Sequence, residues 1–147
     1  GTPQEIFDYA VDRWGGFDLD VAANIDNAKC ERFIDEEHDA LKTEWICEQA
    51  WLNPPYGRTM LSFAEKVLEE IALGNCKRVV LLVPARTETR WFLRLAHHAS
   101  EIVFFAGRIR FVKNGSNASA PFPSCFMVIE NIDISNPAVE FGLKVIH

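Results

Sequence analysis

The sequence predicts an α/β fold with one layered, mostly parallel sheet and an antiparallel hairpin towards the C-terminal end. Helix-like and strand-like segments alternate along the chain. The run 79–83 is entirely apolar, which is typical of a central parallel strand covered on both faces. With 147 residues, 48% of them hydrophobic, the chain is large enough for one core. We therefore expect residues 1–147 to form a single domain.

The first predicted elements are a helix and a strand. Thr2 is placed to cap the helix, Pro3 suits its first turn, and Glu5 would complete a capping box. The helix should end at the glycine pair 15–16. Residues 17–23 then predict a strand that runs into a polar loop.

The remaining elements follow in order. We expect strands at 32–34 and 49–52, a helix at 59–73 closed by Gly74, the central strand at 79–83, a helix at 88–98, and strands at 102–105, 109–112 and 126–129. The last two should form the antiparallel hairpin across the polar loop 113–124. A weaker pattern predicts a final strand near 139–145.

Charge is distributed unevenly along the chain, whose net charge is −6. Residues 1–50 contain 13 acidic and 4 basic side chains, whereas residues 77–113 contain 8 basic and 2 acidic ones. An acidic half suits a cationic ligand that carries a ribose, and a basic half suits phosphates. Ordinary surface charge would explain the same distribution equally well.

The four cysteines, at 30, 47, 76 and 125, form no C-x-x-C pair. His97 and His98 have no cysteine or acid at a metal-ligand spacing, so we expect reduced thiols, a cytoplasmic location and no metal site. The start of the chain has no basic-then-apolar leader, and no apolar run reaches the length of a membrane span.

The tetrapeptide Asn53-Pro54-Pro55-Tyr56 is the most informative motif. It follows a predicted strand and precedes a helix, so it lies where open α/β sheets bind ligands. Two successive prolines fix the backbone and remove two donors, which leaves the Asn53 side-chain oxygen and the Pro54 carbonyl as rigid acceptors. Two acceptors that hold the hydrogens of an exocyclic amine make its nitrogen more tetrahedral and direct its lone pair at a methyl donor. Tyr56 offers a ring on which a flipped base can stack. A simple double-proline turn is the alternative.

The motif resembles the catalytic motif of amino-methyltransferases. Other segments, in the same order, resemble the compact phage-type DNA N6-adenine methyltransferases over residues 2–130: Thr2-Pro3, 17–23, 27–30, 39–41 with Trp45, 82–87, 90–92, 107–111 and 120–124. The resemblance implies a Rossmann-like methyltransferase sheet of reduced size and direct transfer from S-adenosylmethionine to N6 of adenine in DNA. It implies no metal, and for a phage-encoded protein it implies the bacterial host cell as location.

The resemblance also implies a donor site. Asp20 would hold the amino acid part of the donor, Asp39 would contact its adenine, and Thr2 with Pro3 would fold over the methionine end. Asp18 is an alternative to Asp20, because alternation in a strand puts both on one face. The glycine-rich loop of many methyltransferases is missing, although small residues such as Ala22 would still let the backbone approach the donor. Asn53 would also border the donor.

Basic residues are the candidate DNA contacts. Arg90 and Arg94 share a helix face, and Arg108 and Arg110 alternate with apolar residues in the predicted hairpin. The candidate contacts are Arg58, Arg86, Arg90, Arg94, Arg108, Arg110 and Lys113. We expect no separate target-recognition domain, so sequence specificity should be short, loose or supplied by a homodimer. The alternative for each basic residue is an ordinary solvated face.

Alternative functions remain open from the residues alone. Cytosine C5 methylation is disfavoured because the chain has no Pro-Cys pair. N4-cytosine methylation uses the same acceptor logic, and a protein-glutamine methyltransferase also uses this tetrapeptide. A non-catalytic nucleic-acid-binding module on a decayed fold would explain the missing glycine loop, but it would have no need of an intact motif.

Overall fold

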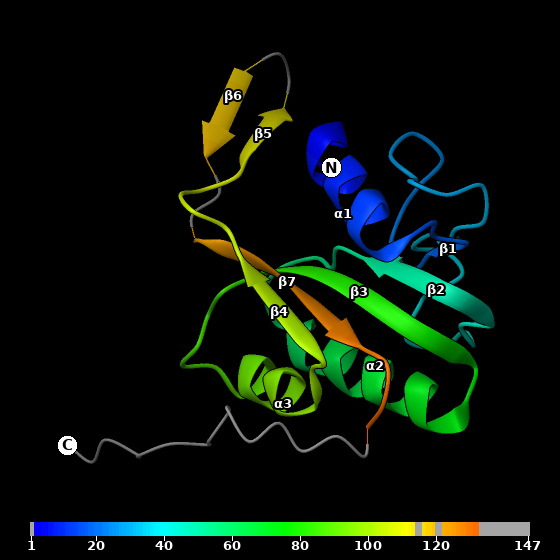
Figure 1. Ribbon diagram of the computed structural model, residues 1–147. Coiled ribbons are helices and arrows are strands. Elements are labelled where there is room, and N and C mark those ends of the chain that lie inside the picture. Colours follow the sequence, from blue (N-terminus) through cyan, green and yellow to red (C-terminus); the bar gives the residue numbers. More distant parts are fainter. Residues whose placement is uncertain (1, 114–115, 120–121, 133–147) are drawn as a thin grey trace.

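A five-stranded sheet forms the centre of the structure, with α1 against one face and α2 and α3 against the other (Figure 1). The computed structural model describes residues 2–113, 116–119 and 122–132. In chain order the elements are α1 (Gln4–Trp14), β1 (Leu19–Asp20), β2 (Cys47–Leu52), α2 (Met60–Leu73), β3 (Cys76–Pro84), α3 (Arg90–His98), β4 (Glu101–Phe104), β5 (Arg110–Lys113), β6 (Ser116–Ser119) and β7 (Ser124–Ile129). In this part of the chain no helix is long and apolar enough to cross a membrane.

The strand order in the sheet is β1-β2-β3-β7-β4. β1, β2 and β3 run parallel to one another, and β7 is antiparallel to both of its neighbours, β3 and β4. β4 therefore runs in the direction of the first three strands. The prediction of an α/β fold is confirmed, and the sheet is mixed, parallel from β1 to β3 and antiparallel at β7.

The central strand β3 is covered on both faces, as its apolar sequence predicted. Val79, Leu81 and Val83 pack in the core that includes α2 and α3. Val80 and Leu82 pack in the second core, under α1. In that second core Phe7 of α1 meets Trp51 of β2 edge to face, with ring centroids 5.1 Å apart. Such aromatic pairs add to the stabilisation from burial.

The predicted hairpin between 109–112 and 126–129 is wrong. An antiparallel hairpin is present, but β5 pairs with β6, from Arg110 opposite Ser119 to Lys113 opposite Ser116. All six residues of β7 are buried, so this strand lies between β3 and β4 inside the main sheet instead. The hairpin strand β6 comes from the segment 113–124 that the sequence predicted to be a loop.

The capping box predicted for α1 is also wrong. The N-cap residue is Pro3, and no side chain caps the helix. The carbonyl of Pro3 accepts the first N–H groups, from Ile6 and Phe7, and the Thr2 hydroxyl is bonded to Asn53 instead. The C-terminal end of α1 at Gly15 is confirmed, with φ of 90°.

Two other strands are shorter than the sequence indicated. The strand expected over 17–23 is reduced to β1, and the one at 32–34 is a single bridge between Asp20 and Phe33. Leu19, Val21 and Ile34 are nevertheless buried in the core. The predicted strand near 139–145 lies outside the described residues.

Polar contacts at its C-terminal end join α1 to the edge strand β4. The Arg13 guanidinium and the Trp14 indole N–H both donate to the Glu101 carboxylate, at 2.7 and 2.6 Å. Arg13 first, and Trp14 in addition, hold the pKa of Glu101 below its ordinary value. This carboxylate therefore fixes α1 over the sheet, and with it the segment around Thr2.

We predict that Glu101→Gln lowers the melting temperature by a few degrees at pH 7. Because the folded-state pKa is depressed, the contribution of Glu101 exists above the unfolded pKa of about 4.3 and is lost as pH falls through the folded value. Thermal unfolding of both proteins between pH 7 and pH 3 should show the difference shrinking. Glu48→Gln is the control, since its pair with Lys77 is exposed. A difference that is equally large at pH 3 would contradict this role.

Candidate active site

The carboxyl ends of three parallel strands meet at one edge of the sheet. Asp20 is the last residue of β1, Asn53 follows β2 directly, and Ala85 follows β3. The register places Asp20 opposite Trp51, two residues before Asn53. Open α/β sheets bind their ligands at this edge. The structure therefore brings together the candidate acid of the donor site and the proline motif.

The motif turns sharply between β2 and α2. Pro54 is buried, Pro55 and Tyr56 point outward, and Tyr56 is 41% exposed. Gly57 has φ of 117°, a conformation that side chains disfavour, and its carbonyl accepts the N–H of Met60 as α2 begins. Partial burial raises the pKa of the Tyr56 hydroxyl, so the ring is neutral at physiological pH.

Asn53 is half-buried, and its side chain has a defined partner. Its amide Nδ2 donates to the Thr2 hydroxyl oxygen at 2.8 Å, across 51 residues of chain. Thr2 itself is 8% exposed. Because the amide nitrogen faces Thr2, the side-chain oxygen of Asn53 is left as an acceptor.

Asp20 is 3% exposed and organises the loop that follows β1. One carboxylate oxygen accepts the backbone N–H of Lys29 at 2.9 Å, and the other accepts that of Ala22 at 3.4 Å. Burial raises the pKa of Asp20, and these two N–H groups oppose that shift. The carboxylate keeps lone pairs beyond those the loop uses.

Asp18 lies at the other end of the strands. Its carboxylate accepts the backbone N–H groups of Glu48 and Gln49, at 3.1 and 2.8 Å, near the start of β2. The two acids that alternation could not separate are therefore distinguished by their partners, and Asp20 alone is at the edge with Asn53.

Other candidate donor-site residues are spread around this edge. Pro3 begins α1 beside Thr2, and Ala22 is half-buried in the loop after β1. Asp39 belongs to the turn after the Asp20–Phe33 bridge, where it has φ of 53° and accepts the N–H of Leu41. The assignment of Asp39 to the donor site stays a prediction.

The basic residues separate into paired and unpaired groups. Arg86 pairs with Glu88 and stacks on Phe122 at 4.3 Å, and Arg94 pairs with Glu65. Lys77 and Arg78 pair with Glu48 and Glu130 near the amino ends of β2 and β3. In the part of the chain that the structure describes, no such acid partner is found for the exposed residues Arg58, Arg90, Arg108 and Arg110.

The hairpin carries part of this basic charge. β5 and β6 lie between the end of β4 and the start of β7, so the hairpin projects beyond the carboxyl edge of the parallel strands (Figure 1). At its base Ile109 is buried in the core under α1. Arg108 and Arg110 flank it and are exposed, and Lys113 is the last residue of β5.

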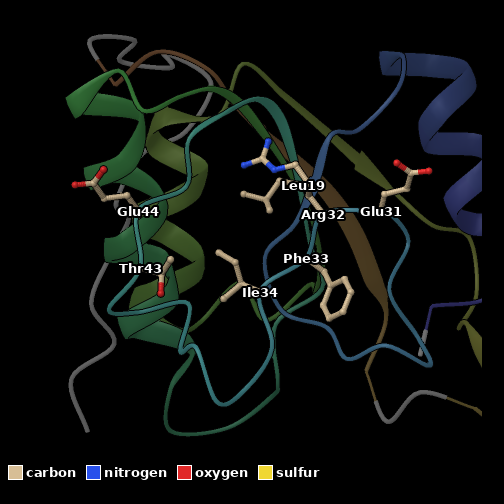
Figure 2. A pocket seen from close by; sticks show the side chains of 7 residues that line it. All are labelled: Leu19, Glu31, Arg32, Phe33, Ile34, Thr43 and Glu44. Atoms are coloured by element: carbon tan, nitrogen blue, oxygen red, sulfur yellow. The ribbon is translucent and has the colours of Figure 1, made fainter.

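Two surface cavities are lined by residues outside the proline motif. One, of about 310 Å³, is lined by Leu19, the segment 31–34, Thr43 and Glu44 (Figure 2). The other, of about 450 Å³, lies near the starts of β2 and β3. Their charged side chains include Arg32, Lys77 and Arg78, which are bonded to neighbouring protein groups. Neither cavity is lined by Asn53 or Asp20. Across the described ranges, no three histidine, cysteine or acidic side chains are grouped to hold a metal ion.

The sequence alone indicates no role for Lys29. Its N–H binds Asp20, and its ammonium group binds the Gln4 side chain at 3.1 Å and lies 5.8 Å from the ring of Phe7. It thus ties the loop after β1 to the start of α1. The segment 27–30 is one of those that resemble the family, but its contact with α1 becomes visible only in the folded structure.

Comparison with known proteins identifies the family. The model of the family described as DNA N-6-adenine-methyltransferase (Dam) matches residues 1–136. The chain belongs to this family. The Dam match spans every element described above, including the proline motif and the hairpin.

Two Dam relatives come from bacteriophages, and both are called DNA N-6-adenine-methyltransferase. The protein of Escherichia phage T1 is 38% identical over 104 residues, 70% of this chain and 42% of the relative. That of Haemophilus phage HP1 (strain HP1c1) is 36% identical over 115 residues, 77% of this chain and 65% of the relative. The chain thus spans less than two thirds of the length of either relative.

We predict that Asp20→Ala loosens the loop after β1. Loss of a hydrogen bond to a charged group should speed exchange of the Lys29 amide hydrogen by about tenfold or more. Hydrogen exchange followed by NMR measures this directly. Asp18→Ala is the matched control and should leave Lys29 unchanged, because Asp18 binds β2. An equal effect of both substitutions would contradict the specific anchoring by Asp20.

Proposed function

We propose that this chain transfers a methyl group from S-adenosylmethionine to the exocyclic N6 amine of adenine in DNA. The observation that carries the proposal is the Asn53 amide, whose nitrogen is bonded to Thr2 and whose oxygen is free to accept. Membership of the Dam family and the names of the two phage relatives favour adenine over cytosine.

The acceptor pair would activate the amine. The Asn53 side-chain oxygen and the Pro54 carbonyl each accept one amine hydrogen, which localises the nitrogen lone pair and directs it away from the ring. Both acceptors are held in place before substrate arrives, since Pro54 is buried and the Asn53 amide is bonded. Positioning and fixed dipoles then account for most of the rate, without a covalent enzyme intermediate.

Tyr56 would receive the base. The reacting amine is inaccessible inside a duplex, so the adenine must leave the stack. Tyr56 is exposed immediately after the prolines and presents its ring at the same edge. Stacking on an aromatic ring stabilises an extruded base by about 1–3 kcal/mol.

The residues around the edge fit S-adenosylmethionine, which would supply an electrophilic methyl group on a sulfonium. The N–C bond would form as the S–C bond breaks, S-adenosylhomocysteine would leave, and the surplus proton of the amine would pass to water. Asp20 offers a buried carboxylate for the donor's ammonium group, and we prefer it to Asp18, whose oxygens are bonded to β2. Asp39 would contact the donor's adenine. Thr2, Pro3 and Asn53 would border the methionine end, and the small side chain of Ala22 would let the backbone come close. We retain the Rossmann-like methyltransferase sheet, as a single domain, as the fold that this site implies.

DNA would approach over the carboxyl edge. The exposed residues Arg58, Arg90, Arg108 and Arg110, together with Lys113, are the proposed phosphate contacts, and Arg86 would contribute through its stack on Phe122. The phage relatives favour action on DNA in a bacterial host cell. A homodimer stays a prediction.

The decisive experiment is transfer of a labelled methyl group from S-adenosylmethionine to unmethylated duplex DNA, followed by nucleoside analysis. We expect labelled N6-methyladenine from the wild type. Asn53→Ala should reduce transfer by at least about a hundredfold, because it removes a preorganised acceptor. Donor affinity, measured by calorimetry, should change less than about twofold, since the main donor contacts lie elsewhere.

Other outcomes select other functions. Labelled N4-methylcytosine would show that the target base is cytosine and not adenine. Label in protein but not in DNA would favour a glutamine substrate. DNA binding without donor binding would favour a non-catalytic module. Loss of donor binding in Asn53→Ala would contradict the division of roles between Asn53 and Asp20.

We predict that Arg110→Ala reduces the slope of log affinity against log salt by about 0.9, the value of one phosphate contact on duplex DNA. Fluorescence anisotropy with one duplex at several salt concentrations gives the slope. Lys77→Ala, near the amino ends of the strands and paired with Glu48, should leave it unchanged. Equal slopes for the wild type, Arg110→Ala and Lys77→Ala would show that Arg110 does not contact a DNA phosphate.

A further inference from the structure

We infer that Cys47 and Cys76 form an oxidation site, at which a hydroperoxide converts two neighbouring thiols into a disulfide that joins β2 to β3. The inference goes beyond the proposed function and does not depend on it. Both thiols are free, their sulfur atoms are 3.2 Å apart, and the two residues are direct partners in the parallel ladder. The pair lies at the amino ends of these strands, whereas Asn53 follows the carboxyl end of β2.

The backbone around the pair is already placed for a disulfide. Neighbouring strands lie about 4.8 Å apart, within the Cα–Cα range of about 4.4–6.8 Å over which two cysteines can be bridged. The Cys47 N–H donates to the carbonyl of Asn75 at 3.0 Å, which holds the start of β2 against the residue before Cys76. Both side chains pack against the core that includes α2, so they lie on one face of the sheet. The sulfurs have to approach by only about 1 Å to reach the bonding distance of about 2.05 Å.

The four thiols differ in their surroundings. Cys47 is half-buried, which gives an oxidant access to the pair, whereas Cys76 is buried beside it. The hydrogen bond with Cys47 lowers the pKa of Cys76 and raises that of Cys47. Burial raises the pKa of Cys30 and of Cys125 to about 12, so both stay protonated at neutral pH and react slowly. Proximity and reactivity therefore both favour the pair over the other two cysteines.

The reaction consumes one molecule of hydrogen peroxide for each pair. The first sulfur attacks the peroxide, the O–O bond breaks, and the sulfur becomes a sulfenic acid as water leaves. The second sulfur then attacks the first, so that the S–S bond forms as the S–O bond breaks and a second water leaves. The two thiols lose two electrons to the peroxide, and their protons end in the two waters. Because the sulfurs are already in contact, the second step precedes further oxidation of the sulfenic acid.

The bond would fix the register of β2 against β3. The segment that it closes, from Cys47 to Cys76, contains the proline motif and all of α2. Closing a loop of this length restricts the unfolded chain, so the oxidised protein should melt several degrees higher than the reduced one. Asn53 lies about 20 Å along β2 from Cys47, so the bond should leave the geometry of the motif unchanged.

The test is oxidation of the folded, reduced chain with hydrogen peroxide, followed by labelling with N-ethylmaleimide in denaturant and mass spectrometry. We expect the number of labels to fall from four to two. Peptide mapping should give one cross-link, between Cys47 and Cys76, and dithiothreitol should restore all four labels. The same oxidation in urea should give a mixture of pairings, because the fold alone selects this pair.

Two variants complete the experiment. In Cys47→Ser both the cross-link and the rise in melting temperature should disappear. Cys30→Ser is the matched control, since Cys30 is also half-buried, and it should behave as the wild type with one label fewer. Four labels after oxidation, cross-links to other cysteines in the folded chain, or sulfinic acid at the pair without a cross-link would each overturn the inference. So would a lower melting temperature of the oxidised protein, because it would show that the ladder does not accommodate the bond.

Discussion

The site depends on the parallel alignment of β1, β2 and β3. Their backbone ladder brings three strand ends to one edge, although the residues that follow them are far apart in sequence. The ladder lies between two apolar layers, and a shift of one residue would turn the buried side chains of β3 to the wrong layers. Packing of the core therefore fixes where Asp20 and Asn53 lie relative to each other.

Sequence reasoning succeeded where the deciding forces are local. The central strand, the helix ends at Gly15 and Gly74, and the exposed turn around Tyr56 all follow from the residues next to them. The location of the proline motif at a strand end was predictable for the same reason.

It failed where a distant partner decides. Thr2 satisfied the local pattern of a helix cap, yet its hydroxyl binds a side chain 51 residues away. Asp18 and Asp20 share a strand pattern, and only their backbone partners distinguish them. The hairpin partner of β5 was predicted wrongly. The apolar strand β7 is buried inside the main sheet, and β6 pairs with β5 instead. Arg94 looked available for DNA because nothing near it in sequence indicates Glu65.

The place of β7 in the sheet has a consequence for how the chain is made. β7 is the last strand of the described chain, but it lies between β3 and β4, which are both synthesised earlier. Until residue 129 has left the ribosome, β3 has an unpaired edge and β4 has no neighbour in the sheet. An unpaired apolar strand edge is a template for association with other chains. The nascent protein must therefore keep one edge of its central strand unpaired until nearly the whole described chain exists, and completion of the sheet is a late event.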